Sequence, residues 1–415
     1  MVETFDCTDN GTSIWEFDFP GTPPKGDIPT YQVTMARHAV GFGPAAEVVD
    51  TIAAGAFFVP PSPCDVYGWN SQTTNTPVWH YNVPNCDASL LYDEERVIAV
   101  SDDGTTAVFS AFIPDGQTST PALFALDAQT GALLFQKGAA DAGTGAGTVS
   151  VSVGGSFITW NTQLGLKVYG RDGALRDTVA SQGPVEASES GAFIGSCTEN
   201  SAKVFAWDGS SGSYLLNQTF TPPASPASDT WFCVDVALSS DGSGQEDTEL
   251  VSYAWISGDV LTARVITCAC LRVPTPPPPP HTHTRNFVPS LSLPPHLHTD
   301  SLVTGKVVID WTSQTNSKLQ TNPTIRMDGN YVGVALWGDQ DDTPTAVVLS
   351  TAAGATPVFT YTTPGSMFGV DLVVDHSACT PTNDVIYFAV AGKHTPANVM
   401  GNGGDAFAWR IDVAL

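Results

Sequence analysis

The chain has 415 residues, of which 42 are Asp or Glu and 16 are Lys or Arg, so its formal net charge is −26. Nucleic acids are bound through clustered Lys and Arg, and a chain this acidic with no basic stripe speaks against such a partner. It contains 38 Gly and 31 Pro but no apolar run of membrane-spanning length. This composition predicts an all-β protein of short strands joined by turns, with no membrane span.

The first residues, MVETFDCTDNGTS, are acidic and polar. They lack the basic start and apolar core of a secretory signal, so the chain as written is expected to be cytoplasmic, or secreted or at the cell surface if its N-terminus is incomplete. Asn10 and Asn217 each begin an Asn-x-Thr glycosylation sequon. Residues 12–22, TSIWEFDFPGT, predict a strand that has no partner before it.

Two hairpin phrases alternate along the chain. The first is strand, Gly turn, strand, as in VIAVSDDGTTAVFSAF at 97–112. Its turn glycines, for which a positive φ is predicted, are Gly104, Gly155, Gly191 and Gly329. The second phrase is ALFALDAQTGALLFQK at 122–137, with relatives at 64–83, 166–180, 202–220 and 345–364. Together they make units of four antiparallel strands, and such repeats are typical of β-propellers.

The two ends of the chain predict how the ring closes. The sequence ends with DAFAWRIDVAL, a third-strand phrase that no fourth strand follows. Placing Trp15–Phe19 beside Ala408–Val413 would supply that fourth strand from the start of the chain and remove the last open sheet edge. We therefore expect residues 1–415 to form one monomeric propeller of about seven four-stranded blades.

The phrase at 122–137 resembles the tryptophan-docking repeat of quinoprotein-type propellers. Ala125, Asp127, Thr130 and Gly131 match that repeat, and Phe135 stands near the place of its tryptophan. The wider pattern is similar to WD-repeat and YVTN-type propellers. The resemblance implies a fold, and fold does not by itself imply function.

Residues 271–300, LRVPTPPPPPHTHTRNFVPSLSLPPHLHTD, interrupt the fifth blade. A Pro-rich segment cannot join a sheet ladder, so a disordered or extended loop is predicted. Its composition is also what a pyrimidine-rich intron end would encode, and we favour a retained intron or gene-model error. A metal site is the third reading, on the histidines His281, His283, His296 and His298.

Cysteines, aspartates and histidines are the other candidates for chemistry. Disulfide candidates among the eight cysteines are Cys64 with Cys86 and Cys197 with Cys233, and buried free thiols are the alternative. Asp339, Asp341 and Asp342 are weak Ca²⁺ candidates, for which solvated turns are the favoured reading. No other cofactor is expected. The remaining histidines His38, His80, His376 and His394 are read as structural rather than as one shared site.

Two sets of residues are given structural roles. We expect Asp127, Asp208 and Asp412 to cap hairpin turns. We expect tryptophans to pack between blades, at Trp69, Trp79, Trp160, Trp207, Trp311, Trp337 and Trp409.

No hydrolase elbow, phosphate loop or dinucleotide fingerprint occurs in the sequence. The favoured function is therefore a non-enzymatic scaffold that binds a protein, peptide or glycan through rim loops. The resemblance implies the alternative, a quinoprotein-type oxidoreductase with pyrroloquinoline quinone and Ca²⁺ in the channel. A purely structural repeat in a larger assembly is the third possibility.

Overall fold

The computed structural model describes most strands of the chain and the connections around them. The described residues are 13–18, 30–36, 51–56, 64–70, 77–83, 86, 97–101, 103–115, 118–188, 190–198, 201–221, 232–238, 249–257, 260–268, 307–314, 324–328, 330–336, 344–350, 353, 356–363, 365–380, 383–393 and 404–414. They form seven four-stranded sheets. None of the helices in this part of the chain is long and apolar enough to cross a bilayer.

Six of these sheets are built from strands that are consecutive in the sequence. The first contains β2 (Thr30–Ala36), β3 (Thr51–Ala56), β4 (Cys64–Asn70) and β5 (Trp79–Val83). The second contains β6 (Ile98–Val100), β7 (Thr106–Asp115), β8 (Thr118–Asp127) and β9 (Leu133–Lys137). The third contains β10 (Ala146–Val151), β11 (Ile158–Thr162), β12 (Gly165–Tyr169) and β13 (Leu175–Val179), after the short helix α1 (Ala139–Ala142) and with the 3-10 turn η2 (Val153–Gly155) between β10 and β11.

The remaining sheets follow the same plan. The fourth contains β14 (Val185–Ala187), β15 (Phe193–Thr198), β16 (Ser201–Asp208) and β17 (Ser213–Phe220). The fifth contains β18 (Phe232–Leu238), β19 (Glu249–Ser257), β20 (Val260–Cys268) and β21 (Val307–Gln314). The sixth contains β22 (Thr324–Asp328), β23 (Tyr331–Ala335), β24 (Ala346–Ser350) and β25 (Pro357–Tyr361). The seventh combines β26 (Met367–Thr380), β27 (Asn383–Lys393) and β28 (Gly404–Ala414) with β1 (Ser13–Asp18).

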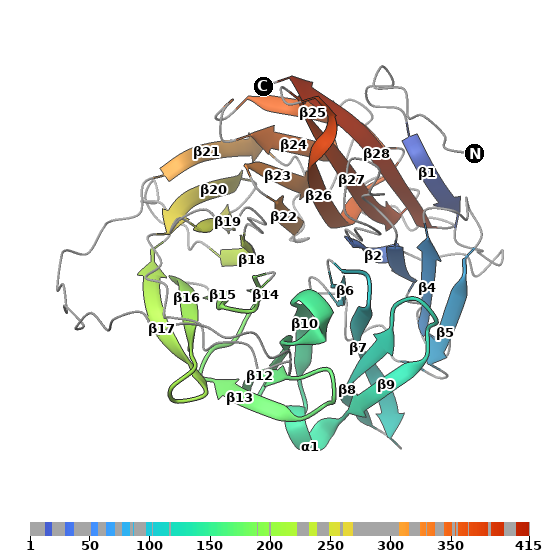
Figure 1. Ribbon diagram of the computed structural model, residues 1–415, viewed down its shortest axis with the longest axis vertical. Coiled ribbons are helices and arrows are strands. Elements are labelled where there is room, and N and C mark those ends of the chain that lie inside the picture. The colour runs from blue at the N-terminus through green and yellow to red at the C-terminus, as the bar shows by residue number, and fades with distance from the viewer. Residues whose placement is uncertain are drawn as a thin grey trace, which may run out of the picture.

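The sheets are arrayed around a central axis, and the strands nearest the axis are β2, β6, β10, β14, β18, β22 and β26 (Figure 1). All neighbouring strands within a sheet are antiparallel. The ring closes as the sequence predicts, because β1 pairs with β28 and Trp15 lies opposite Ala408. The predicted fold class, an all-β propeller whose last sheet takes its fourth strand from the start of the chain, is confirmed.

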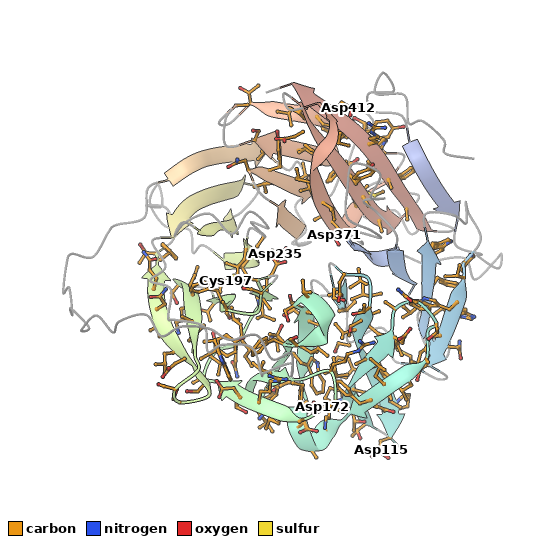
Figure 2. All side chains as sticks on the ribbon, in the orientation of Figure 1. Asp115, Asp172, Cys197, Asp235, Asp371 and Asp412 are labelled. Carbon is orange, nitrogen blue, oxygen red and sulfur yellow. The ribbon has the colours of Figure 1, made fainter. Side chains whose placement is uncertain are left out.

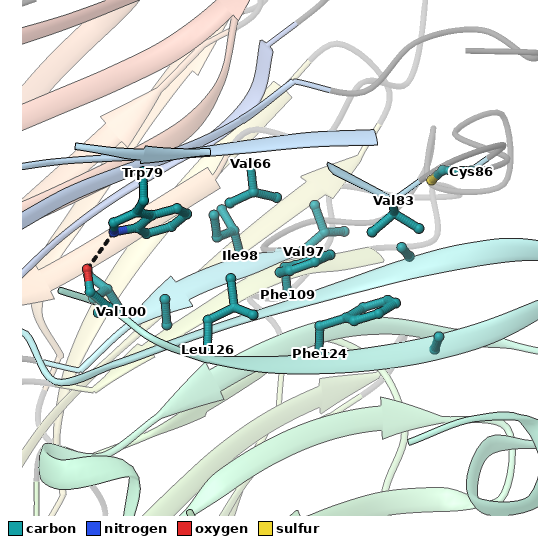
Figure 3. Packing of buried hydrophobic residues seen from close by; sticks show 14 of the residues in the cluster. Val66, Trp79, Val83, Cys86, Val97, Ile98, Val100, Phe109, Phe124 and Leu126 are labelled. Carbon is teal, nitrogen blue, oxygen red and sulfur yellow. Dashed lines mark hydrogen bonds between the residues drawn. The ribbon is translucent and has the colours of Figure 1, made fainter. Parts of the chain in front are cut away.

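Apolar clusters fill the junctions between neighbouring sheets. One joins Val66 and Trp79 of the first sheet to Phe109 and Phe124 of the second, whose rings stack with centroids 4.7 Å apart (Figure 3). Further clusters join the second sheet to the third, the third to the fourth, the fourth to the fifth and the sixth to the seventh. Because a central strand packs on both faces, β7 reads TAVFSAFIPD, and seven successive residues of it are buried.

The strands on either side of the insertion pair with each other. Val260 lies opposite Gln314 and Arg264 lies opposite Asp310. The expectation that 271–300 interrupts a hairpin is therefore consistent with the pairing of β20 with β21. Residues 271–300 themselves lie outside the described residues, so the retained-intron hypothesis stays a prediction.

Candidate binding surface

A serine-capped turn recurs at one end of three successive sheets. It connects the first strand to the second, and begins at Ser101, Ser152 and Ser188. In each, the serine hydroxyl accepts a hydrogen bond from the backbone amide five residues later, at 2.9 to 3.0 Å. The glycine three residues after each serine donates to the serine carbonyl and has a φ between 63° and 69°. The predicted positive φ is thus confirmed at Gly104, Gly155 and Gly191, whereas Gly329 lies outside the described residues.

We call this end of the ring the serine rim, and it also carries the turns that connect each third strand to its fourth. Antiparallel strands return to the same end after every second turn, so both kinds of turn lie together. The capping role of these serines was not predicted from the sequence. Their signal is a serine three residues ahead of a turn glycine, as in SDDG, SVGG and SESG.

Two of the predicted turn caps are present on the serine rim. Asp127 Oδ1 accepts hydrogen bonds from the Thr130 amide at 3.0 Å and the Thr130 hydroxyl at 2.9 Å. Asp208 Oδ1 accepts from the Ser210 amide at 2.9 Å and the Ser210 hydroxyl at 2.7 Å. Bonds from Ser210 and Ser211 lower the pKa of the Asp208 carboxyl. Both residues therefore hold turns, as predicted.

The third predicted cap is wrong. Asp412 lies inside β28, opposite Val385, and the strand continues to Ala414, so there is no turn for its carboxylate to cap. Its Oδ1 instead accepts a hydrogen bond from Arg410 Nη2 at 3.3 Å, and both side chains are largely buried.

Trp79 joins the first sheet to the second at the serine rim. Its side chain is 7% exposed, and its indole Nε1 donates to the Ala128 carbonyl at 2.6 Å. The indole covers Gly131, where an added Cβ would lie 3.0 Å from ring atoms, and it also covers Gly68 on the neighbouring strand, where an added Cβ would clash with the ring. The glycine of the repeat phrase therefore leaves room for an aromatic side chain from the preceding sheet.

Phe135 occupies the corresponding place between the second and third sheets. An added Cβ on Gly173 would lie 2.9 Å from the Phe135 ring. Phe135 has no polar hydrogen to donate, and the polar link comes from Arg171 in the turn of the third sheet. Arg171 Nη2 donates to the Thr105 carbonyl at 3.1 Å and lies 3.4 Å from Asp127 Oδ2.

Three leucines are exposed next to these junctions. Leu133 and Leu134 begin β9 with exposed fractions of 46% and 38%, and Leu175 begins β13 with 52%. The Phe135 ring, in the middle of β9, lies beside Gly173 in the turn before Leu175. We call Leu133, Leu134 and Leu175 the leucine face. Exposed leucines on two adjacent sheets make this region a candidate for contact with a partner.

Positive and negative charges balance around the leucine face. Among the described side chains on β9, β13 and the turns before them, three cations, Lys137, Arg171 and Arg176, stand with three carboxylates, Asp127, Asp172 and Asp177. Lys137 Nζ lies 5.3 Å from the centre of the Tyr169 ring, and the Arg176 guanidinium lies 5.1 Å from that of Phe157. In a chain of net charge −26, this region does not repel an acidic or neutral partner.

Buried acids lie on the strands nearest the axis, and the sequence analysis missed them. They are Glu186 on β14, Asp235 on β18 and Asp371 on β26, each at most 6% exposed. Glu186 Oε2 accepts a hydrogen bond from the Leu238 amide, and Asp235 and Asp371 accept from the next residue's amide at 2.8 Å. Figure 2 shows Asp235 and Asp371 on the inner side of the ring, and Asp115, Asp172 and Asp412 further out. Within the described residues, no group of three His, Cys, Asp or Glu side chains is arranged to hold a metal ion.

His80 has the structural role that was expected. Its Nε2 lies 2.6 Å from Asp65 Oδ1, and its ring stacks on Tyr67 with centroids 4.5 Å apart. Burial and the nearby Asp65 raise the pKa of the Tyr67 hydroxyl. The side chains of His38, His376 and His394 lie outside the described residues, as do the Ca²⁺ candidates Asp339, Asp341 and Asp342.

Two of the four disulfide candidates are described with their side chains. Cys86 and Cys197 are both buried and both disulfide-bonded. Cys197 Sγ lies 3.7 Å from the Asp235 carbonyl of β18, the strand that carries Cys233. The side chains of Cys64 and Cys233 lie outside the described residues, so the two pairings stay predictions.

The tryptophans whose side chains are described pack as expected. Trp69, Trp79, Trp160 and Trp409 are at most 7% exposed, and the Trp207 ring lies edge-on to Phe157 with centroids 5.2 Å apart. The side chains of Trp311 and Trp337 lie outside the described residues.

No protein-family model and no curated protein matches the sequence. Among solved structures, the C-terminal WD40 domain of Sif2 is similar at 11% identity and a TM-score of 0.46, over 93% of this chain and 98% of that domain. Sqt1 of Saccharomyces cerevisiae is similar at 10% identity and 0.45, over 97% and 99% of the two chains. Hsv2 of Kluyveromyces lactis is similar at 10% and 0.45, over 88% and 93%.

Proposed function

We propose that the protein is a non-enzymatic scaffold that binds a protein or peptide partner at the serine rim, with the leucine face as the apolar contact. The observation that carries this proposal is the exposure of Leu133, Leu134 and Leu175 on two adjacent sheets. Burying a leucine that is about half exposed removes roughly 1 kcal/mol of apolar hydration cost, so three such residues form a useful contact.

The surroundings of the leucine face suit a binding surface. The turns beside it are held by Asp127 and by the Arg171 bonds to the second sheet, so a partner meets a pre-formed surface and loses little free energy in ordering it. The balanced charges give this region no strong electrostatic preference of its own, so the apolar contact contributes most to binding. The quinone-dependent alternative draws no support from the described residues.

The chain offers a matched pair of variants as the test. Leu175 and Leu164 are both 52% exposed, but Leu164 lies in the turn between β11 and β12, at the opposite rim from Leu175. Wild type, Leu175→Glu and Leu164→Glu would be immobilised as full chains, and the proteins captured from an extract of the source cells would be quantified by mass spectrometry.

We expect wild type and Leu164→Glu to retain the same partner, and Leu175→Glu to retain about tenfold less of it, since a buried charge in an apolar contact costs at least 1.4 kcal/mol. Equal capture by Leu175→Glu and wild type would contradict the proposed site. Circular dichroism spectra of the three proteins should coincide, which separates lost binding from lost folding.

A further inference from the structure

The fourth sheet ends in an exposed strand that differs from its neighbours. β17 is the outer strand of its sheet, so one of its edges has no strand beside it within that sheet. Its sequence, SYLLNQTF, contains no charged residue, whereas the outer strand β13 carries Arg176 and Asp177 and β9 carries Lys137. Leu215 and Leu216 on this strand are 53% and 57% exposed.

An uncharged outer strand with exposed leucines is a hazard, because it can pair with the strand of another molecule. Natural edge strands are usually protected by charges, by proline or by a bulge. β17 has a bulge at one residue: Phe205 lies opposite Leu216 and Val204 lies opposite Gln218, so Asn217 is the extra residue between them.

Asn217 combines this position with a modification motif. It is exposed, and Asn217-Gln218-Thr219 is a sequon whose threonine is also exposed. Within the described residues no hydrogen bond to the Asn217 side chain is present, so its amide is available to an enzyme. Disulfide bonds at Cys86 and Cys197 are typical of the oxidising compartments in which N-glycosylation takes place.

We propose that Asn217 carries an N-linked glycan, which covers the exposed leucines of β17 and protects this outer strand. In the reaction, Asn217 Nδ2 attacks the anomeric carbon of a lipid-linked oligosaccharide. A nitrogen–carbon bond forms, the carbon–oxygen bond to the lipid pyrophosphate breaks, the amide loses one proton, and the lipid pyrophosphate leaves. The glycan then marks the boundary of the leucine face, which lies on the two preceding sheets.

The threonine of the sequon provides a matched control. Thr219→Ser keeps the sequon and Thr219→Ala destroys it, while both change the same exposed side chain. The full chain would be secreted from eukaryotic cells behind a cleavable signal, in an Asn10→Gln background so that only the sequon at 217 reports. Treatment with peptide N-glycosidase in heavy-oxygen water would label each formerly glycosylated Asn for mass spectrometry.

We expect a glycosidase-sensitive mobility shift and a heavy-oxygen label at residue 217 for the background protein and Thr219→Ser, and the loss of both for Thr219→Ala and Asn217→Gln. The native protein purified from its source cells should carry the same label. An unmodified Asn217 in the secreted or in the native protein would overturn the proposal. This outcome is independent of the binding proposal, whose test uses Leu175 and Leu164.

Discussion

The junction between the first and second sheets and the junction between the second and third are built on the same plan with different chemistry. In the first, Trp79 both covers the glycine of the next turn and donates a hydrogen bond to Ala128. In the second, Phe135 covers Gly173, and the polar link runs in the opposite direction, from Arg171 back to Thr105.

Ring packing and hydrogen bonding are therefore separable at these junctions. A tryptophan supplies both from one side chain, whereas phenylalanine supplies only the packing and a second residue must restore the link. The link at the second junction is more exposed, since the Arg171 side chain is 39% exposed. We therefore expect the first junction to be stronger and less sensitive to salt.

The largest effect should follow Trp79→Ala. Removing a buried tryptophan costs about 3–5 kcal/mol, and the Ala128 carbonyl would also lose its donor. Trp79→Phe keeps the ring packing and should cost only about 1 kcal/mol. Urea unfolding of both variants measures these values, and equal losses would show that the hydrogen bond rather than the ring holds the junction.

Phe135→Ala should come next, at about 2 kcal/mol, because this ring is only partly buried. Phe135→Leu keeps apolar volume but loses the ring that lies 5.8 Å from Lys137 Nζ, and should cost less than Phe135→Ala. The same urea unfolding experiment applies. A cost as large as that of Trp79→Ala would contradict the ranking of the two junctions.

Arg171→Gln should have a smaller effect, about 0.5–1 kcal/mol, because exposed ion pairs contribute little. Its cost should fall further at high salt, whereas the cost of Trp79→Phe should not change. Unfolding midpoints at low and high sodium chloride concentration measure this contrast. A cost of Arg171→Gln that is independent of salt would show that its bond to the Thr105 carbonyl, rather than Asp127, is what matters.

The smallest effect should be that of Asp103, which adds a second link at the same junction. Burial alone would raise the pKa of its carboxyl, but hydrogen bonds from Ser101, Thr105 and the Gly154 amide outweigh burial and lower it. A lowered folded-state pKa stabilises the protein at neutral pH, and this contribution is lost as the pH falls below the ordinary aspartate range and through the lowered folded value.

Asp103→Asn should therefore cost less than about 1 kcal/mol at pH 7, since the group is half exposed. Asp103→Asn should also make the free energy of unfolding depend less on pH on the acid side of neutrality. Unfolding free energies of wild type and Asp103→Asn between pH 3 and pH 7 test this, and parallel curves would exclude a role for ionised Asp103.

The sequence predicts the turn glycines from local pattern. It predicts the long-range pairing of β1 with β28 because an incomplete four-strand unit stands at each end of the repeats. Gly131 was recognised only as a residue of the repeat, because the indole that covers it, Trp79, comes from another sheet and is visible only in the structure.

The candidate site was less predictable. Nothing in the sequence LLFQK shows that β9 is the outer strand of its sheet. The exposure of its two leucines follows from that position, which only the structure gives. The serines of the rim were overlooked because serine is common in any turn. Asp412 was misread because its strand continues beside β27, a pairing that the residue itself does not signal.

The pairing of β1 with β28 also affects biosynthesis. The six sheets made of consecutive strands can assemble while the polypeptide emerges from the ribosome. The seventh cannot, because β1 precedes the other six sheets in the chain and β28 follows them. A nascent chain therefore carries an unpaired strand while the six intervening sheets are synthesised, and cellular chaperones have most reason to act during this interval.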